Sequence, residues 1–483
     1  MLELVLSLAI VTQDQIPLRA EPREKAARHL TLTQGDMLEL RGRRGDYLQV
    51  YDHRRERAGF IRATQAGLYE LTPDEAPRLR AVAGFLATQP GSEAMGIGHA
   101  AAFLKAAPAE AIDAGVFEDL GRMADRLAWR ASYLARDHSA NGEKAARLVA
   151  EHLAVAETYG VSTYRVEDQG RITFCYEGEA WRRVLAWPAS AERKARAALS
   201  LTRHDCVPDT FSPGKRLEND RWRAEALEEA LAAGAREDAF PAHLKNRLKI
   251  RLAGVWAGLA QRLARRPQPD AGAILQAGLQ AETQLAGVDR APLADGDIEA
   301  WHEAAIRVGA SRWAARPQTL AQPAKGRPGL RVEAGEQPGQ TCVSVVPAKD
   351  EAALTQCTWG QVWSASLAVA PDGRHMALAV QPLAHWRELW MFRLEADAWR
   401  LDVIPPAVEP AEVAYVEFAG WVPGKSQFLA ARETVNNGRH QTRFELVDGK
   451  TLKVEKSVDK PGNLSTFYRW QDPLWKGGTL AVR

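Results

Sequence analysis

The chain has 483 residues, which is too long for one ordinary hydrophobic core and predicts about three domains. Hydrophobic residues make up 46% and charged residues 26%, the balance of a folded globular protein, which excludes a disordered chain. Basic residues number 63 and acidic residues 61, so the net charge of +2 excludes a chain-wide field that would attract nucleic acid or an anionic membrane. No apolar run approaches the roughly 20 residues that cross a bilayer.

The first segment, residues 1–66, alternates short apolar runs with turn signals. The turns fall at Gln34-Gly35-Asp36 and Arg44-Gly45-Asp46, where the glycines supply the positive φ that such turns need. This pattern predicts a small closed antiparallel β barrel. Residues 1–11 are apolar but lack a basic region and a cleavage site. We interpret them as the first strand of a mature chain whose leader has been replaced by a start Met.

Four short motifs lie in this segment. They are Leu18-Arg19-x-x-Pro22, Gln34-Gly35-Asp36, Gly45-Asp46-Tyr47-x-x-Val50 and Gly59-Phe60-Ile61. With these motifs the segment resembles a bacterial SH3 (SH3b) domain, whereas the whole chain resembles no characterised family. Domains of the SH3b family bind cell-wall peptides or act as interaction modules beside a catalytic domain, so the resemblance implies a binding role. The family commonly has Trp where this chain has Tyr47 and Phe60, a change that keeps the apolar packing but alters any aromatic contact with a ligand.

The candidate ligand-binding residues combine this resemblance with the charged segment 51–57. Arginine presents a planar fork of donors that suits an anionic partner or a peptide carboxylate. The alternative interpretation of the segment is a solvated hairpin tip. The candidates are Arg19, Tyr47, Tyr51, His53, Arg54, Arg55, Arg57 and Phe60.

From residue 73 the apolar period changes to that of helices, which predicts a helical domain over 73–315. A β hairpin interrupts it at 161–178, with its turn at Asp168-Gln169-Gly170. Short connections between paired helices indicate a helical bundle or an irregular α-solenoid. The main helices are expected at 74–88, 116–135, 142–159, 179–187, 191–202, 221–233, 242–265, 272–285 and 297–314.

Residues 316–340 are rich in Pro, Gly and Gln and predict a linker, and residues 341–483 predict an all-β domain. The stretch Ala370-Pro371-Asp372-Gly373-Arg374 between two strands resembles the core of TolB-like or WD40-like β-propeller blades. A second such unit is expected over 418–453 and a third from Phe467. Because a closed propeller needs at least about four blades, we favour a β sandwich. A partial propeller that another chain completes is the second choice.

The four cysteines form two sequence-local couples, Cys175 with Cys206 and Cys342 with Cys357. If they pair in this way, each disulfide stays inside one predicted domain, and the protein belongs to an oxidising compartment, either periplasmic or secreted. The alternative is four buried free thiols. No C-x-x-C motif is present.

The sequence carries no recognised catalytic motif, and we expect no cofactor and no metal. A cysteine-peptidase site at Cys206 with His204 or His243, and a zinc site at His138, Glu151 and His152, are both disfavoured by their context. We therefore predict a non-catalytic scaffold or interaction protein of the cell envelope that binds a protein, a peptide or peptidoglycan, and no nucleic acid. A cell-wall hydrolase with an unrecognised site in the helical domain and a subunit of an envelope assembly remain the alternatives. The oligomeric state stays open.

Overall fold

The computed structural model describes residues 7–168, 171–237, 240–318, 326–348, 353–408, 411, 413–436 and 438–478. These residues divide into two compact units, one up to Phe211 and one from Ser212. An antiparallel sheet at the N-terminus, helices in the middle and sheets towards the C-terminus confirm a mixed α+β chain. The boundary lies inside 73–315, so the helices predicted as one domain belong to two units.

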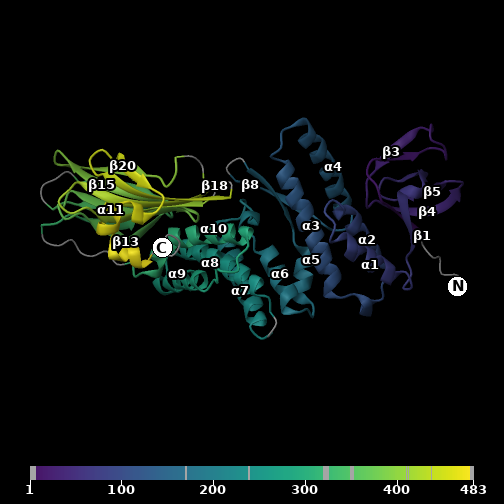
Figure 1. The fold of residues 1–483 in the computed structure, drawn as a ribbon, viewed down its shortest axis with the longest axis horizontal. Coiled ribbons are helices and arrows are strands. Elements are labelled where there is room, and N and C mark those ends of the chain that lie inside the picture. Colours follow the sequence, from purple (N-terminus) through teal and green to yellow (C-terminus); the bar gives the residue numbers. More distant parts are fainter. Residues whose placement is uncertain are drawn as a thin grey trace. The chain divides into compact units, whose positions relative to one another are not determined.

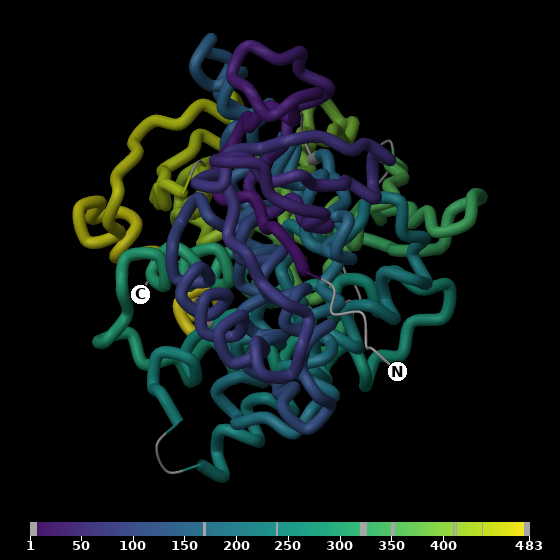
Figure 2. Tube along the Cα trace, turned by 90° about the vertical axis from the view of Figure 1, so that its right-hand side faces the viewer, coloured from purple at the N-terminus to yellow at the C-terminus, as the bar shows by residue number. Residues whose placement is uncertain are grey.

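Seven antiparallel strands form the N-terminal sheet (Figures 1 and 2). Their order in the sheet is β3-β2-β6-β5-β4-β1-β7. The closed barrel predicted for residues 1–66 is not formed by these strands, because the sheet ends at β3 on one side and at the added strand β7 on the other, and these two edges do not pair among the described residues. The sheet therefore continues to Glu70. The strands are β1 Ser7–Val11, β2 Ile16–Arg19, β3 Arg28–Leu32, β4 Met37–Arg44, β5 Tyr47–Asp52, β6 Arg57–Arg62 and β7 Ala66–Glu70.

Alternate residues of these strands bury one face of the sheet in a common core. The core residues are Ala9, Val11, Ile16, Leu18, Leu32, Leu38, Leu48, Val50 and Ile61. Gly59 is required in β6, because a Cβ there would lie 2.7 Å from Cγ of Leu18. The predicted turn glycines have positive φ, 92° at Gly35 and 58° at Gly45, so both turn predictions are confirmed.

Six helices and one hairpin complete the first unit. Side chains of β1 and β7, Ile10 and Tyr69, belong to the same hydrophobic core as α1 to α5, so the N-terminal sheet and the helices share one packed interior. The hairpin confirms the prediction for 161–178, although residues 169–170 of its expected turn lie outside the described residues. The elements are α1 Ala76–Leu86, α2 Glu93–Ala106, α3 Ala114–Leu134, α4 Ala140–Glu157, β8 Thr163–Asp168, β9 Arg171–Tyr176, α5 Glu179–Ala186 and α6 Ala191–Leu201.

The second unit begins with four helices and continues with two sheets. β10 lies inside the predicted linker 316–340, so part of that segment is ordered as a strand. The helices are α7 Pro213–Gly234, α8 Ala242–Ala264, α9 Ala271–Ala286 and α10 Asp295–Ser311. The strands are β10 Gly329–Ala334, β11 Thr341–Val346, β12 Thr355–Thr358, β13 Gln361–Val369, β14 His375–Leu383, β15 Trp386–Glu395, β16 Ala398–Ile404, β17 Val413–Trp421, β18 Gln427–Asn436, β19 Arg439–Asp448 and β20 Val454–Val458.

The larger sheet of this unit consists of two antiparallel meanders, β13 to β16 and β17 to β20, joined by a short parallel pairing of β15 with β17. Alternation buries both faces of each meander. One face of the first meander packs on β10 to β12, its other face packs on the second meander, and the far face of the second packs on two C-terminal helices. These helices are α11 Ser465–Trp470 and α12 Pro473–Gly478.

This stacking fits the expected sandwich-like packing of sheets, whereas the propeller assignment stays a prediction. The third β unit expected from Phe467 is wrong, because α11 and α12 insert Phe467 and Trp475 against Phe444 and cover the last sheet. At the other end of the stack, the outer face of β10 to β12 presents polar side chains. Ser344 and Thr355 share a hydrogen bond of 2.9 Å on that face.

Candidate binding face of the N-terminal sheet

The face of the N-terminal sheet that points away from its core carries aromatic and basic side chains in register. Phe60 of β6 pairs with Arg19 of β2 on one side and with Gln49 of β5 on the other. Arg28 of β3 lies opposite Arg19, which extends this row across the sheet. Side chains directly opposite on neighbouring strands lie close enough to interact, so Arg19 adjoins the Phe60 ring and Arg28 lies beyond Arg19 at the end of the row.

A second row runs beside the first. Tyr47 of β5 pairs with Arg62 of β6 and with Arg44 of β4. Cζ of Arg62 lies 5.8 Å from the centre of the Tyr47 ring, and Cζ of Arg44 lies 5.8 Å from the centre of the Phe60 ring. The rings of Tyr47 and Phe60 are only 8% and 9% exposed, because the aliphatic parts of the arginine side chains cover them. The guanidinium groups of these arginines remain in solvent.

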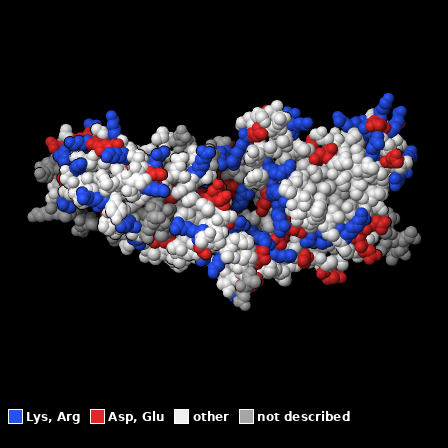
Figure 3. Space-filling model, viewed as in Figure 1, with Lys and Arg blue, Asp and Glu red and all other residues white. Residues whose placement is uncertain are grey.

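The charges on these two rows are largely uncompensated. Among the described residues, Arg28 and Arg44 have no acidic partner. Arg62 reaches Glu24 at 3.1 Å, but both side chains are exposed, so water screens the pair. Figure 3 shows blue Lys and Arg side chains gathered over the strands of this sheet, with fewer red carboxylates between them. We call the surface formed by Arg19, Arg28, Arg44, Tyr47, Gln49, Phe60 and Arg62 the arginine face.

Tyr51 and His53 belong to a neighbouring cluster whose charged side chains pair with one another. The guanidinium carbon of Arg41 lies 3.9 Å from the centre of the Tyr51 ring, and the His53 ring meets Tyr51 edge-on. Glu39 binds Arg41 at 3.2 Å and His53 at 2.7 Å. The hydrogen bond from Arg41, with a smaller contribution from His53, lowers the pKa of Glu39. This end of the sheet therefore has little positive charge left for a ligand.

The hairpin-tip arginines lie apart from the arginine face. Arg55 binds Asp52 at 2.6 Å and Asp36 at 3.3 Å, and the backbone N–H groups of Arg54 and Arg55 donate to Asp52. Burial opposes the charge of Arg55, but its bonds to the two carboxylates outweigh burial and raise its pKa. Arg57 is exposed opposite Asp52. Arg55 thus fastens the hairpin tip to the turn that contains Asp36.

The structure therefore brings together some of the predicted residues and separates others. Arg19, Tyr47 and Phe60 share the arginine face, and Tyr51 with His53 adjoins it, whereas Arg54, Arg55 and Arg57 lie at the hairpin tip. Sequence reasoning missed Arg28, Arg44 and Arg62. The alternation of β6 places Arg62 beside Phe60, a signal that the sequence does contain, but Arg28 joins the face only through non-local strand pairing.

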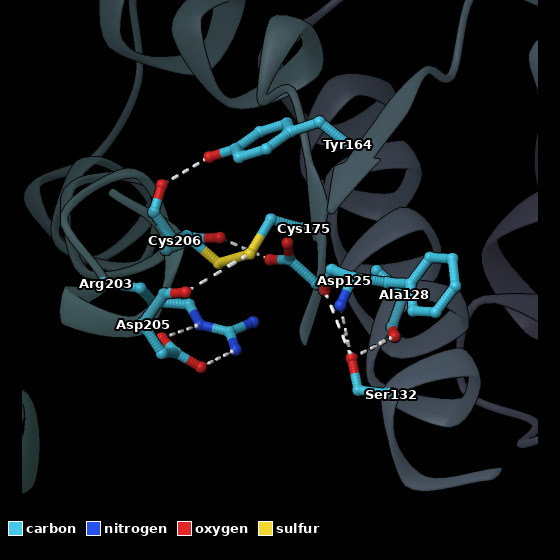
Figure 4. The surroundings of a disulfide bond; sticks show 10 residues. Asp125, Ala128, Ser132, Tyr164, Cys175, Arg203, Asp205 and Cys206 are labelled. Atoms are coloured by element: carbon cyan, nitrogen blue, oxygen red, sulfur yellow. Dashed lines mark hydrogen bonds and ion pairs between the residues drawn. A yellow bond between two sulfur atoms is a disulfide. The ribbon is translucent and has the colours of Figure 1, made fainter. Parts of the chain in front are cut away.

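The two predicted disulfides are formed. Cys175 binds Cys206, and Cys342 binds Cys357 across the paired strands β11 and β12. Neither Cys206 nor Cys175 therefore has the free thiol that a cysteine peptidase needs. Figure 4 shows the first disulfide between the Arg203–Asp205 ion pair and Asp125 of α3. Burial raises the pKa of Asp125, whose carboxylate accepts hydrogen bonds from Trp181 and Ser200.

His152 and Glu151, considered above as zinc ligands, are engaged with the N-terminal sheet. Nε2 of His152 lies 2.9 Å from Asp14, and a carboxylate oxygen of Glu151 lies 3.4 Å from the Thr33 hydroxyl. His138 is exposed just before α4. Within the described ranges, no three His, Cys, Asp or Glu side chains are placed to hold a metal ion.

Comparison with known proteins found no matching family model, no similar curated protein and no similar solved structure. In the part of the chain that the structure describes, no helix combines the length and apolarity needed to cross a membrane.

Proposed function

We propose that this protein is a non-catalytic interaction protein of the bacterial envelope, periplasmic or secreted, and that its arginine face binds a peptide ligand bearing carboxylates. The observation that carries this proposal is the row of exposed arginines in register on one sheet face, of which Arg44 and Arg62 lie over two aromatic rings and, among the described residues, only Arg62 contacts a carboxylate, the exposed Glu24. The two disulfides support the compartment, because such bonds persist where the surroundings are oxidising.

The arginine face has the groups that a peptide with carboxylates needs. Guanidinium groups bind carboxylates through two parallel hydrogen bonds, and such charge-assisted bonds are about twice as strong as neutral ones. Gln49, half-buried beside Phe60 in the first row, offers an amide that can donate to and accept from a peptide backbone. Gly42 opposite it has open space, since a Cβ there would first meet Gln49 at 3.7 Å.

The SH3b resemblance supports the choice of a cell-wall peptide, because domains of that family bind such peptides and the peptide stems carry carboxylates. The substitution of Tyr47 and Phe60 for the family's Trp residues places smaller rings under arginine stems. In this chain the proposed recognition therefore depends more on charge than on a bare aromatic platform.

The test uses the full-length protein and a soluble muropeptide with an intact peptide stem, compared with the same muropeptide after amidation of its carboxylates. We expect the carboxylate form to bind and the amidated form to bind about 10-fold more weakly or worse, since about 1.4 kcal/mol is a tenfold change. The double variant Arg44→Glu/Arg62→Glu should lose binding of the carboxylate form to a similar extent.

A matched control is Arg147→Glu on α4, a side chain that is 82% exposed and lies 3.9 Å from the exposed Glu143 of the same helix. This charge reversal should leave the affinity unchanged. Equal binding of the two muropeptides, or undiminished binding by the double variant, would remove the arginine face as the site.

A further inference from the structure

In the second unit, α10 packs against β17, β18 and β19 around a buried acid. Glu433 of β18 has an exposure of 0%. The Tyr415 hydroxyl of β17 donates to one carboxylate oxygen of Glu433 at 2.8 Å, and Nε2 of His440 of β19 lies 2.7 Å from the other. An ionised carboxylate can only accept, so in that form of Glu433 the Nε2–H of His440 is the donor of this hydrogen bond.

His440 is in turn stacked on a second imidazole. His302, on α10, lies with its ring centre 3.8 Å from that of His440, and the two rings are inclined by only 10°. His302 also contacts the neighbouring Trp301 ring, with 5.3 Å between ring centres. The stack joins helix α10 to the start of β19, next to the connection between β18 and β19.

Charged groups from several elements surround this stack. Glu433 approaches from β18 and Tyr415 from β17, and Arg290, before α10, contributes a positive charge. On α10 itself Glu303 is engaged by Arg307 at 2.6 Å, while Glu299 lies near Gly438 at the hairpin connection.

These contacts favour one distribution of protons. Burying an ionised carboxylate as fully as Glu433 costs free energy unless a cation compensates its charge. Tyr415 remains neutral, because burial raises its pKa well above the ordinary value. His440 is the basic group in contact with Glu433. A proton on His302 is disfavoured by the facing His440 ring, since two imidazolium rings in face contact would repel each other. Burial, followed by the charges of His440 and Arg290, lowers the pKa of His302 to about 4.

We propose that the His302–His440 stack is a proton-operated latch, which holds the β18–β19 hairpin against α10 near neutral pH and loosens it on acidification. A proton added to His302 places a partly buried cation against the His440 ring and near Arg290, and favours conformations in which the rings separate and hydrate. The unfolded or opened form takes up this proton near the ordinary histidine pKa of about 6.5. The latch is therefore closed above that pH and is lost as the pH falls from about 6.5 towards 4.

The test is amide hydrogen exchange of the full chain, read by mass spectrometry in peptides from α10 and the β18–β19 hairpin and corrected for intrinsic exchange rates. Between pH 7 and pH 5 we expect the opening equilibrium of these peptides in the wild-type protein to rise on the order of 10-fold. The His302→Phe variant, which keeps a flat ring but cannot titrate, should show little of this rise. His243→Gln, at an exposed position at the start of α8, serves as the control and should behave as wild type.

A second measurement keeps the inference testable if His302→Phe does not fold. Exchange at the C2 carbon of each imidazole in the wild-type protein reports the protonation of His302 directly. Titration of His302 well below 6.5 supports the latch. Titration near 6.5, or hairpin opening that has the same pH dependence in wild type and His302→Phe, would overturn it.

Discussion

The two β regions of this protein use arginine in opposite ways. On the N-terminal sheet, Arg44 lies over Phe60 with its guanidinium group in solvent and no acidic partner among the described residues. In the C-terminal sheets, Arg387 has an exposure of 0%, binds Glu417 at 2.6 Å and donates to the Gly309 carbonyl of α10 at 2.9 Å. The first arginine is available to a ligand, whereas every direction around the second is occupied by protein.

This difference indicates which charges hold the fold and which do not. Removing one partner of a buried ion pair destabilises the protein severely, because the other charge then stays buried without compensation. An exposed arginine without an acidic partner contributes little to stability, so its replacement should leave the fold intact. The contrast assigns the buried network to folding, and it leaves the arginine face exposed for the recognition that we propose.

The largest effect on stability is expected for Arg387→Met. Glu417 would keep Arg312 at 2.9 Å but lose its closest cation, so the second unit should be destabilised by about 3 to 5 kcal/mol. Denaturant unfolding, with amide exchange to assign the transition to this unit, measures the loss. The control is Arg331→Met, which is 63% exposed on β10 and should change stability by less than about 0.5 kcal/mol. Similar effects of the two variants would erase the contrast between buried and exposed arginines.

The disulfides should come next in size. Cys175 and Cys206 are separated by 31 residues, and Cys342 and Cys357 by 15. Loop-closure entropy then predicts about 3.7 kcal/mol for the first bond and about 3 kcal/mol for the second. Unfolding of the two double Cys→Ser variants, each compared with the oxidised wild-type protein, measures these losses. A larger loss from removal of the shorter loop would show that chain entropy does not control the ranking.

A smaller effect should separate two adjacent arginines at the hairpin tip. Arg55→Ala removes the cation between Asp52 and Asp36, whose side chains are 3% and 6% exposed, and should cost about 2 kcal/mol. Arg54→Ala removes only a 4.0 Å contact with Asp36 and should cost less than about 0.5 kcal/mol. Thermal unfolding of the two variants under the same buffer conditions makes the comparison. Equal losses would mean that the clamp is not specific to Arg55.

Part of this fold was predictable from local patterns. Alternation and turn glycines placed the strands around Gly35 and Gly45, and the segment from Ala370 to Arg374 was correctly predicted as a turn between two strands. The helices near the end of the chain were not predictable in this way, because the aromatic residues around Phe467 fit either a strand or a helix until their packing partner Phe444 is known.

The candidate site was less accessible to sequence reasoning. The sequence favoured the segment 51–57 as a binding site because its charges are adjacent, yet Arg55 forms ion pairs with Asp36 and Asp52. Arg28 reaches the arginine face through the pairing of β2 with β3 and of β2 with β6, which a single sequence does not specify, whereas the two-residue turn at Gly45-Asp46 sets Arg44 opposite Tyr47. In the same way, the alternation of β15 places Arg387 on the buried face with Leu389 and Met391. Its partner Glu417 lies on a later strand, so the sequence alone does not reveal the ion pair.

The most direct test of the central claim is the affinity of two single charge reversals for the carboxylate-bearing muropeptide. Arg44→Glu lies on the arginine face, and Arg54→Glu lies at the hairpin tip of the same sheet. We predict that Arg44→Glu weakens binding by about 10-fold or more, whereas Arg54→Glu changes it less than about twofold. Full binding by Arg44→Glu together with loss of binding by Arg54→Glu would contradict the account and place the ligand at the hairpin tip.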